Sequence, residues 1–287
     1  MKKYVLTGLF MLSLMYPIFA FAEDGKDQPA SVPEVKMYDI MACNVYMDFK
    51  GMTMQKKQHK FLAAFYPTGE VPTPDLIEKI TAYGPDGYSV DIKNQPFDHQ
   101  NRNGWLYNPA VNAYWYMINV DKGFLKAGEY TVEVKLKNGG ILKKSRVQDN
   151  VSADALLASY LKNRKKLYAS HFPSQKRKMP ADADLADVSV LWTPLKKMGG
   201  PDAYYIFRIC EGKSGKEFDT RKVIWFNNIF FERLKNPDAG LNIDRVTIPR
   251  GLKARTHYVY FVEIADHNTM GQTNMTIFQP HHIFTTP

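Results

Sequence analysis

The stretch that decides the fold is VTIPRGLKARTHYVYFVEI, residues 246–264. Four apolar residues occupy alternate positions of its second half: Tyr258, Tyr260, Val262 and Ile264. A period of two predicts a β-strand. The segment 246–252 precedes this strand candidate and contains Pro249 and Gly251, which are typical of turns. This region therefore predicts a sheet of short strands.

Neighbouring segments extend the same pattern. The stretch VSVLWTP at 188–194 is a strand candidate that carries Trp192. Alternating apolar residues predict another strand at 203–209, and a terminal strand at 275–284 would close the sheet.

These segments resemble a fibronectin type III domain over 187–287. The core tryptophan of that family is followed closely by a proline, as Trp192 is here, and its corner tyrosine follows a leucine by six positions, as Tyr258 follows Leu252. The resemblance implies a β-sandwich in which Trp192 and Tyr258 are core residues. The apolar insert 223–231 is longer than the family usually has at that place.

The first half of the chain also indicates short strands separated by turns. The sequences GPDG at 84–87 and NGG at 138–140 are strong turn signals, and the strand candidate 37–49 keeps apolar residues on one face. The segment LKAGEY at 125–130 resembles the approach to the tyrosine corner of bacterial immunoglobulin-like domains. We therefore predict an immunoglobulin-like β-sandwich over 36–148.

The predicted fold class is all-β, with two tandem antiparallel β-sandwich domains, immunoglobulin-like and fibronectin III-like, joined by a short helix and linker. The joining segment is the basic neck 149–186. Apolar residues at helical spacing predict a helix over 153–168, with Ser152 as its N-cap. Prolines and a basic triplet predict an extended connector over 169–186.

The N-terminus has the three parts of a secretory signal peptide over 1–22. Lys2 and Lys3 precede a short apolar run, and AFA at 20–22 is a cleavage site with small residues at its ends. The run is shorter than the roughly 20 residues of a membrane-spanning helix, so an uncleaved anchor is the lesser alternative. Residues 23–35 are expected to form a flexible leader. We expect a periplasmic or secreted protein that does not span a membrane after signal cleavage.

Positive charge is concentrated in one part of the chain. The whole sequence carries +9, which falls to +7 without Lys2 and Lys3. Residues 143–197 hold twelve basic and five acidic residues, an excess equal to that +7. Seven of these basic residues form a candidate site for an anionic partner: Lys162, Arg164, Lys165, Lys166, Lys176, Arg177 and Lys178. The expected partner is a lipid headgroup or an acidic polysaccharide, and a merely solvated helix face is the alternative.

Three tryptophans are candidate aromatic contacts for a glycan or protein partner: Trp105, Trp115 and Trp225. In the strand candidate 113–120, alternation places Trp115 on the face opposite Tyr114 and Tyr116. An exposed tryptophan is a common partner contact. The alternative is that both faces of this strand are covered.

No motif indicates catalysis, a metal site or a cofactor. The sequence has neither Gly-x-Ser-x-Gly nor His-Glu-x-x-His. Met52, Met54 and His59 offer soft ligands for copper, although methionines also fill β cores. His281 and His282 are expected to point to opposite faces of a strand. We predict no catalytic residue, no metal, no cofactor and no nucleic-acid partner.

The two cysteines, Cys43 and Cys210, belong to different predicted domains. Alternation places Cys210 away from the inferred core, and no pattern brings the two strands together. A disulfide needs Cα atoms within about 7 Å. We therefore predict that they do not bridge.

The predicted function is that of an exported, non-enzymatic binding or interaction protein of the cell envelope. Its partner is expected to be an envelope protein, an anionic glycan or a lipid headgroup. A glycan- or cell-wall-binding accessory module is the alternative, and periplasmic copper handling is a more distant one.

Overall fold

The computed structural model describes residues 35–49, 55–109, 111–212 and 218–287. The predicted signal peptide, 1–22, and the leader, 23–35, lie outside these residues except for Val35. Strands dominate the described part, and the prediction of an all-β fold is confirmed. Contacts group residues 33–287 into one compact unit.

The first half of the chain contributes eight strands to the described structure: β1 (Val35–Met47), β2 (Lys57–Pro67), β3 (Ile77–Tyr83), β4 (Ser89–Ile92), β5 (Asn103–Asn108), β6 (Ala113–Val120), β7 (Gly128–Leu136) and β8 (Ile141–Gln148). The second half contributes seven: β9 (Ser189–Leu191), β10 (Tyr204–Gly212), β11 (Phe218–Phe226), β12 (Arg245–Thr247), β13 (His257–Ala265), β14 (Met275–Phe278) and β15 (His282–Thr285). Three α-helices accompany them: α1 (Thr73–Leu76), α2 (Asn150–Ser170) and α3 (Ile229–Glu232). Short 3₁₀ turns complete the described elements: η1 (Pro85–Gly87), η2 (Leu195–Met198) and η3 (Met270–Gln272).

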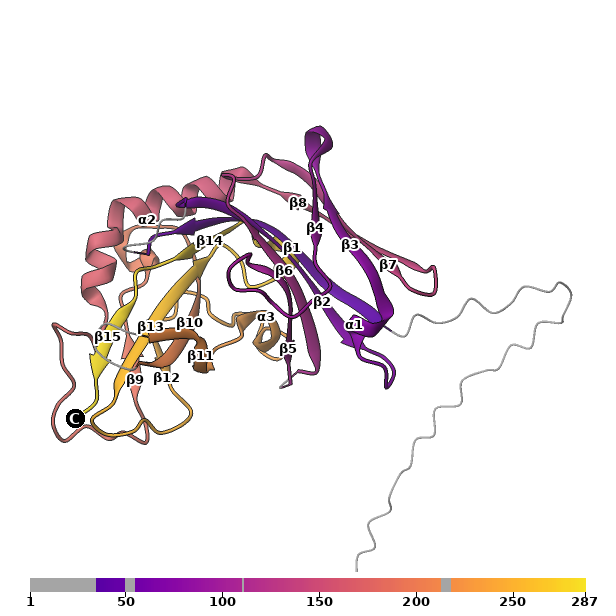
Figure 1. Cartoon of the computed structure of the whole chain (residues 1–287). Helices are drawn as coiled ribbons and strands as arrows, with labels where there is room; N and C mark the ends of the chain where they lie inside the picture. The colour runs from indigo at the N-terminus through magenta and orange to yellow at the C-terminus, as the bar shows by residue number, and fades with distance from the viewer. Residues whose placement is uncertain (1–34, 50–54, 110, 213–217) are drawn as a thin grey trace, which may run out of the picture. The chain divides into compact units, whose positions relative to one another are not determined.

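The largest sheet joins strands from both halves of the chain (Figure 1). Its order is β11-β10-β13-β14-β1-β2-β6-β5, with β15 also paired to β13. The two halves meet where β1 runs parallel to β14, from Asn44 opposite Met275 to Met47 opposite Phe278. The prediction of tandem sandwiches at 36–148 and 187–287 is therefore incomplete, because the two predicted domains share this sheet.

Buried polar contacts reinforce the junction between the halves. The Arg146 guanidinium on β8 donates to the Thr273 carbonyl and to the Asn274 side chain. The Gln148 amide donates to the Asn274 carbonyl at 3.0 Å, and Asn274 Oδ1 accepts from the Asp149 N–H at 2.8 Å. Buried polar groups are stabilising only when they are paired, so these bonds fix one register between the halves.

The first core lies between the large sheet and a second sheet of order β4-β3-β7-β8. Phe61 and Phe65 on β2 and Tyr116 on β6 pack against apolar residues of β3 and β7, such as Ile80 and Val132. This is a sandwich of two sheets. At one corner the Tyr130 hydroxyl donates to the Lys126 carbonyl at 3.1 Å, as the resemblance of 125–130 to a tyrosine corner implies.

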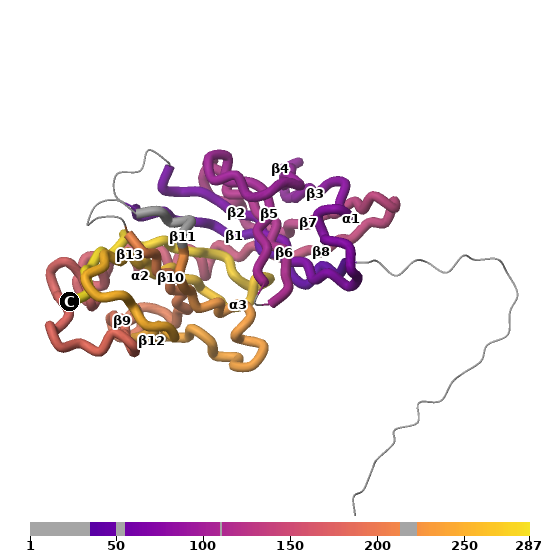
Figure 2. Tube along the Cα trace, turned by 60° about the horizontal axis from the view of Figure 1, so that its bottom comes forward, coloured from indigo at the N-terminus to yellow at the C-terminus, as the bar shows by residue number. Residues whose placement is uncertain are grey.

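The second core lies on the other part of the large sheet, against α2 and the small β12-β9 sheet, whose strands lie side by side (Figure 2). Trp192 and Tyr258 are both buried in it, which confirms that they are core residues. The Tyr258 hydroxyl accepts a hydrogen bond from the Lys253 N–H at 2.9 Å. The predicted leucine–tyrosine corner is therefore present, with Leu252 buried beside it.

The central strand β1 corrects the prediction of one apolar face over 37–49. Met41, Cys43 and Val45 pack on one side, whereas Ile40 and Ala42 pack into the first core on the other. A register shift between Met37 and Asp39 places Met37 on the first-core side. Both faces of β1 are therefore buried.

Two predicted boundaries also change. Helix α2 begins three residues before 153, and its N-cap is Asp149, whose carboxylate accepts from the Val151 N–H at 2.8 Å. Ser152 lies inside the helix and donates to Asp266 at 2.7 Å. The predicted terminal strand 275–284 is divided into β14 and β15 around Pro280, which cannot donate to a ladder.

Cys43 and Cys210 are both buried. The second core takes Tyr205, Phe207 and Ile209 from β10 but not Cys210, which lies on the other, also covered, face of the strand, in agreement with the predicted direction. Their strands, β1 and β10, are separated in the sheet by β14 and β13. Three strand spacings of about 4.8 Å exceed the Cα separation of about 7 Å that a disulfide spans. This geometry supports the prediction that they do not bridge.

In the described part of the chain, no helix combines the length and apolar character needed to cross a membrane.

Candidate functional site

The seven predicted basic residues are all exposed in the structure. Four of them lie in the C-terminal half of α2 and three in the loop that follows: Lys162, Arg164, Lys165, Lys166, Lys176, Arg177 and Lys178. We call these seven residues the basic surface. Among the described residues, Arg164 is the only member with a carboxylate in ion-pair range, Asp48 at 3.8 Å.

Helix α2 presents this surface because its opposite face is anchored. Leu156, Tyr160 and Leu167 are buried in the second core, and the Tyr160 hydroxyl donates to Asp48 at 2.8 Å. Leu161 and Tyr168 also belong to the apolar residues at helical spacing, but they are 41% and 37% exposed.

The loop after α2 is held in place although the sequence predicts an extended connector. Phe172 exchanges two backbone hydrogen bonds with Leu191, at 2.9 and 2.8 Å. The Tyr260 hydroxyl donates to the Pro173 carbonyl at 2.8 Å. Ser174 and Arg177 also exchange backbone hydrogen bonds, which form a tight turn with Lys176 inside it. The basic residues of the loop therefore project from an ordered backbone.

A pocket of about 330 Å³ opens beside this loop. Its wall comes from the end of α2, from the turn at 174–177 and from the start of β15: Tyr168, Ala169, Ser174, Gln175, Lys176, Arg177, His281, His282 and Ile283. Segments that are more than one hundred residues apart in the sequence therefore meet at one site, because β15 pairs with β13 in the second core. We call this cavity the neck pocket.

Stacked rings form one side of the neck pocket. The Tyr168 ring lies 4.2 Å from His282, with planes 25° apart. His282 in turn stacks on His171 at 4.1 Å and on Tyr260 at 5.1 Å. His281 stacks instead on Phe49 at 4.3 Å. The adjacent histidines thus take different neighbours, as alternation along a strand predicts.

The charge of the neck pocket comes from its lysine and arginine. Burial lowers the pKa of His281 to about 4, and that of His171, behind the ring stack, also to about 4. Both imidazoles are therefore neutral at neutral pH. The Arg177 guanidinium donates to the Ser170 carbonyl at 2.8 Å and lies 5.5 Å from the Phe172 ring. Lys176 and Arg177 thus supply the positive charge.

The tryptophans predicted as aromatic contacts are partly covered. Trp115 stacks face to face on Phe231 of α3, with ring centroids 5.4 Å apart. Phe231 is the last residue of the apolar insert 223–231. Trp225 packs against Phe207 at 5.8 Å, and Trp105 meets Tyr114 edge-on at 5.5 Å. The more exposed apolar side chains near them are Leu106, at 43%, and Tyr107, at 45%.

Both ring nitrogens of His59, which was considered as a copper ligand, form hydrogen bonds within the protein. His59 is buried, its Nδ1–H donates to the Gly123 carbonyl at 2.8 Å, and its Nε2 accepts from the Tyr88 hydroxyl at 2.6 Å. Met52 and Met54 lie outside the described residues. The part that the structure describes contains no group of three or more His, Cys, Asp or Glu side chains placed to hold a metal ion.

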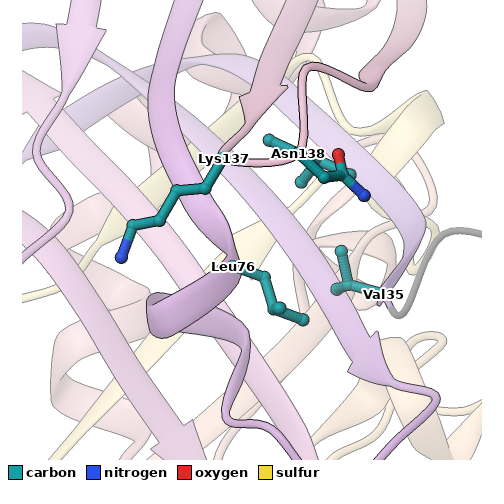
Figure 3. Close-up of a pocket in the computed structure, with 5 residues that line it drawn as sticks. Val35, Leu76, Lys137 and Asn138 are labelled. Atoms are coloured by element: carbon teal, nitrogen blue, oxygen red, sulfur yellow. The ribbon is translucent and has the colours of Figure 1, made fainter.

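A second pocket of about 330 Å³ lies between α1 and the turn from β7 to β8. Val35, Leu76 and Asn138 line it, and Lys137 extends away from Val35 and Asn138 (Figure 3). Val35 is the first described residue.

Sequence reasoning missed the residues that complete the neck pocket, chiefly Tyr168, Ser174, Gln175 and His282. The sequence contains the basic cluster itself as a local signal. It contains no local signal that 281–283 lies against 168–177, since that contact depends on the pairing of β15 with β13.

Comparison with known proteins gives little further information. No protein-family model matches the chain, and no curated protein matches it. A solved structure of the fibronectin(III)-like modules of CbhA from Clostridium thermocellum is similar at 10% identity, over 86% of this chain and 94% of that one, with a TM-score of 0.21. At this level of similarity, the match carries no argument about function.

Proposed function

We propose that the protein is an exported, non-enzymatic binding protein of the cell envelope that holds an acidic polysaccharide on its basic surface. The observation that carries this proposal is the set of seven exposed cations on α2 and its loop, only one of which has a described carboxylate within 4 Å. The signal-peptide pattern at 1–22 supports a location where such polymers occur.

The electrostatic argument rests on clustering. Exposed charges interact over about 8 Å at physiological salt, so charges of one sign act together only when they are neighbours. Residues 162, 165 and 166 are neighbours on adjacent helical turns, and 176–178 follow in the ordered loop. A polymer with regularly spaced carboxylates can contact several of these cations at once.

A concave site favours a polysaccharide over a membrane. The neck pocket lies within the basic surface, and Lys176 and Arg177 belong to both. A flat lipid surface would leave the pocket unfilled, whereas one unit of a polymer can enter it.

The test measures binding of the full mature chain to a polyuronate, with a neutral glucan as reference. We expect binding to the polyuronate that weakens steeply as salt rises. The triple variant Lys165→Gln, Lys166→Gln, Lys178→Gln should lose most of it. A matched control removes three other exposed lysines, Lys93, Lys122 and Lys137, and should bind as the wild type does.

Equal losses in both triple variants would show that only net charge matters and would contradict the proposal. Binding to vesicles that contain anionic phospholipid, without binding to the polyuronate, would also contradict it and would identify a membrane as the partner.

A further inference from the structure

We infer that the neck pocket is the recognition site for a single acidic sugar unit, a hydroxylated ring that carries one carboxylate. This inference rests on the proposed function and specifies it. The basic surface would attract the polymer, and the neck pocket would bind one sugar unit of it.

The size of the pocket fits one ring. Ligand pockets in proteins usually have volumes of about 300–1,000 Å³. The neck pocket, at about 330 Å³, is at the lower end of this range. It therefore suits a monosaccharide unit better than an extended chain or a folded peptide.

The charges favour a carboxylate on the loop side of the pocket. Lys176 is exposed, and its ammonium makes no hydrogen bond or ion pair with the described residues. The Arg177 guanidinium is fixed by the Ser170 carbonyl and by the Phe172 ring, which leaves other N–H groups for a ligand. The C-terminal end of α2 carries partial negative charge, which disfavours an anion there. Arg177 offsets this charge by donating to a terminal carbonyl.

The rest of the wall suits the uncharged part of a sugar. Tyr168 is 37% exposed and is held by its stack on His282, so it offers a fixed ring against which a pyranose can pack. The Gln175 amide and the Ser174 hydroxyl add donors and acceptors for sugar hydroxyls. A simple inorganic anion would use the cations alone and would gain nothing from the ring.

The experiment measures binding of free glucuronate to the full mature chain by calorimetry, with glucose and inorganic phosphate as comparison ligands. We expect glucuronate to bind and glucose not to bind. Lys176→Glu should weaken glucuronate binding by about tenfold or more, which is a loss of about 1.4 kcal/mol. Tyr168→Ala should also weaken it, while Tyr168→Phe should retain it.

The matched control is Lys162→Glu. It makes the same change of charge on α2, at a residue that does not line the pocket. It should lower polyuronate binding but leave glucuronate binding within about twofold of the wild type. Circular dichroism checks that each variant is folded.

Three results would overturn the inference. If Lys162→Glu and Lys176→Glu weaken glucuronate binding equally, or glucuronate does not bind, the pocket is not the site, although polyuronate binding by the wild type would still support the proposed function. If phosphate binds as well as glucuronate and Tyr168→Ala has no effect, the site recognises any small anion. Loss of the proposed function would appear differently, as a wild type that does not bind the polymer.

Discussion

The outer face of the β4-β3-β7-β8 sheet and the basic surface both carry several lysines, yet their charges are arranged differently. On the sheet, Lys79 lies 3.2 Å from Asp91, Lys135 lies 2.8 Å from Glu78, and Lys143 lies 2.8 Å from Glu133. On the basic surface, Arg164 alone has such a partner among the described residues.

This difference distinguishes lysines that form ion pairs within the fold from cations that remain available to bind a partner. Pairs across neighbouring strands help to hold the sheet and cancel its field. The basic surface keeps its field, since α2 uses its buried face for packing and leaves its cations in solvent. The number of basic residues alone does not distinguish the sheet face from the basic surface.

The largest expected effect tests whether the first and second cores unfold together. Trp192 is buried in the second core, between His171 and Tyr205. Trp192→Ala should lower the free energy of unfolding by about 3–5 kcal/mol, because it removes a large buried ring. Urea unfolding followed by circular dichroism should remain a single transition, because both cores share one sheet. A first core that stays folded after the second has melted would contradict this.

A pH-dependent loss of stability should come from the side of α2. The pKa of His171 is lowered from 6.5 to about 4 by burial, so the unfolded chain takes up a proton between these values while the folded protein does not. Stability should therefore fall as pH drops from 6.5 toward 4, by about 3 kcal/mol for this group, since one pKa unit is 1.36 kcal/mol.

Urea unfolding at pH 7 and at pH 4.5 measures this loss. His171→Phe removes the titrating group and keeps a ring in the stack. It should shrink the difference between the two pH values, whatever its effect on stability at pH 7. An unchanged difference would mean that His171 is not the source.

The two tyrosine corners allow a direct comparison of the two cores. Tyr130→Phe removes the hydrogen bond to the Lys126 carbonyl, and Tyr258→Phe removes the one from the Lys253 N–H. Each should cost about 1 kcal/mol of unfolding free energy, the usual net value of such a bond. Chemical denaturation of both variants measures it. A much larger loss of unfolding free energy in one variant would show that its corner hydrogen bond contributes more to stability than such bonds usually do.

Local patterns were enough to predict much of the fold. The alternation of Tyr258, Tyr260, Val262 and Ile264 predicts β13. The resemblance at Leu252 and Tyr258 implies a core tyrosine, and Tyr258 is buried in the structure. Both depend on residues that are close in the sequence. The N-cap was misassigned for a similarly local reason, because Ser152 and Asp149 have the same capping chemistry and only the backbone decides between them.

Long-range pairing could not be predicted in this way. The parallel pairing of Asn44 with Met275 joins residues more than two hundred positions apart. The sequence of neither strand indicates which strand it pairs with. The neck pocket has the same origin, since His282 reaches Tyr168 only after β15 has paired with β13. The basic cluster could be predicted from sequence, whereas the cavity beside it could not.

The smallest expected effect tests the opening comparison itself. The variant Lys79→Gln, Lys135→Gln, Lys143→Gln removes one partner from each of three ion pairs, and the variant Lys165→Gln, Lys166→Gln, Lys178→Gln removes three cations that have no described carboxylate in range. The first should lower the melting temperature by roughly one or two degrees at low salt, because exposed pairs contribute little but attractively. The second should leave it unchanged or raise it slightly, because it relieves repulsion between like charges. Thermal melts at low and high salt measure both, and screening should bring the two variants together. If the second variant is the less stable one at low salt, the basic surface is part of the scaffold, and its charges are not reserved for a partner.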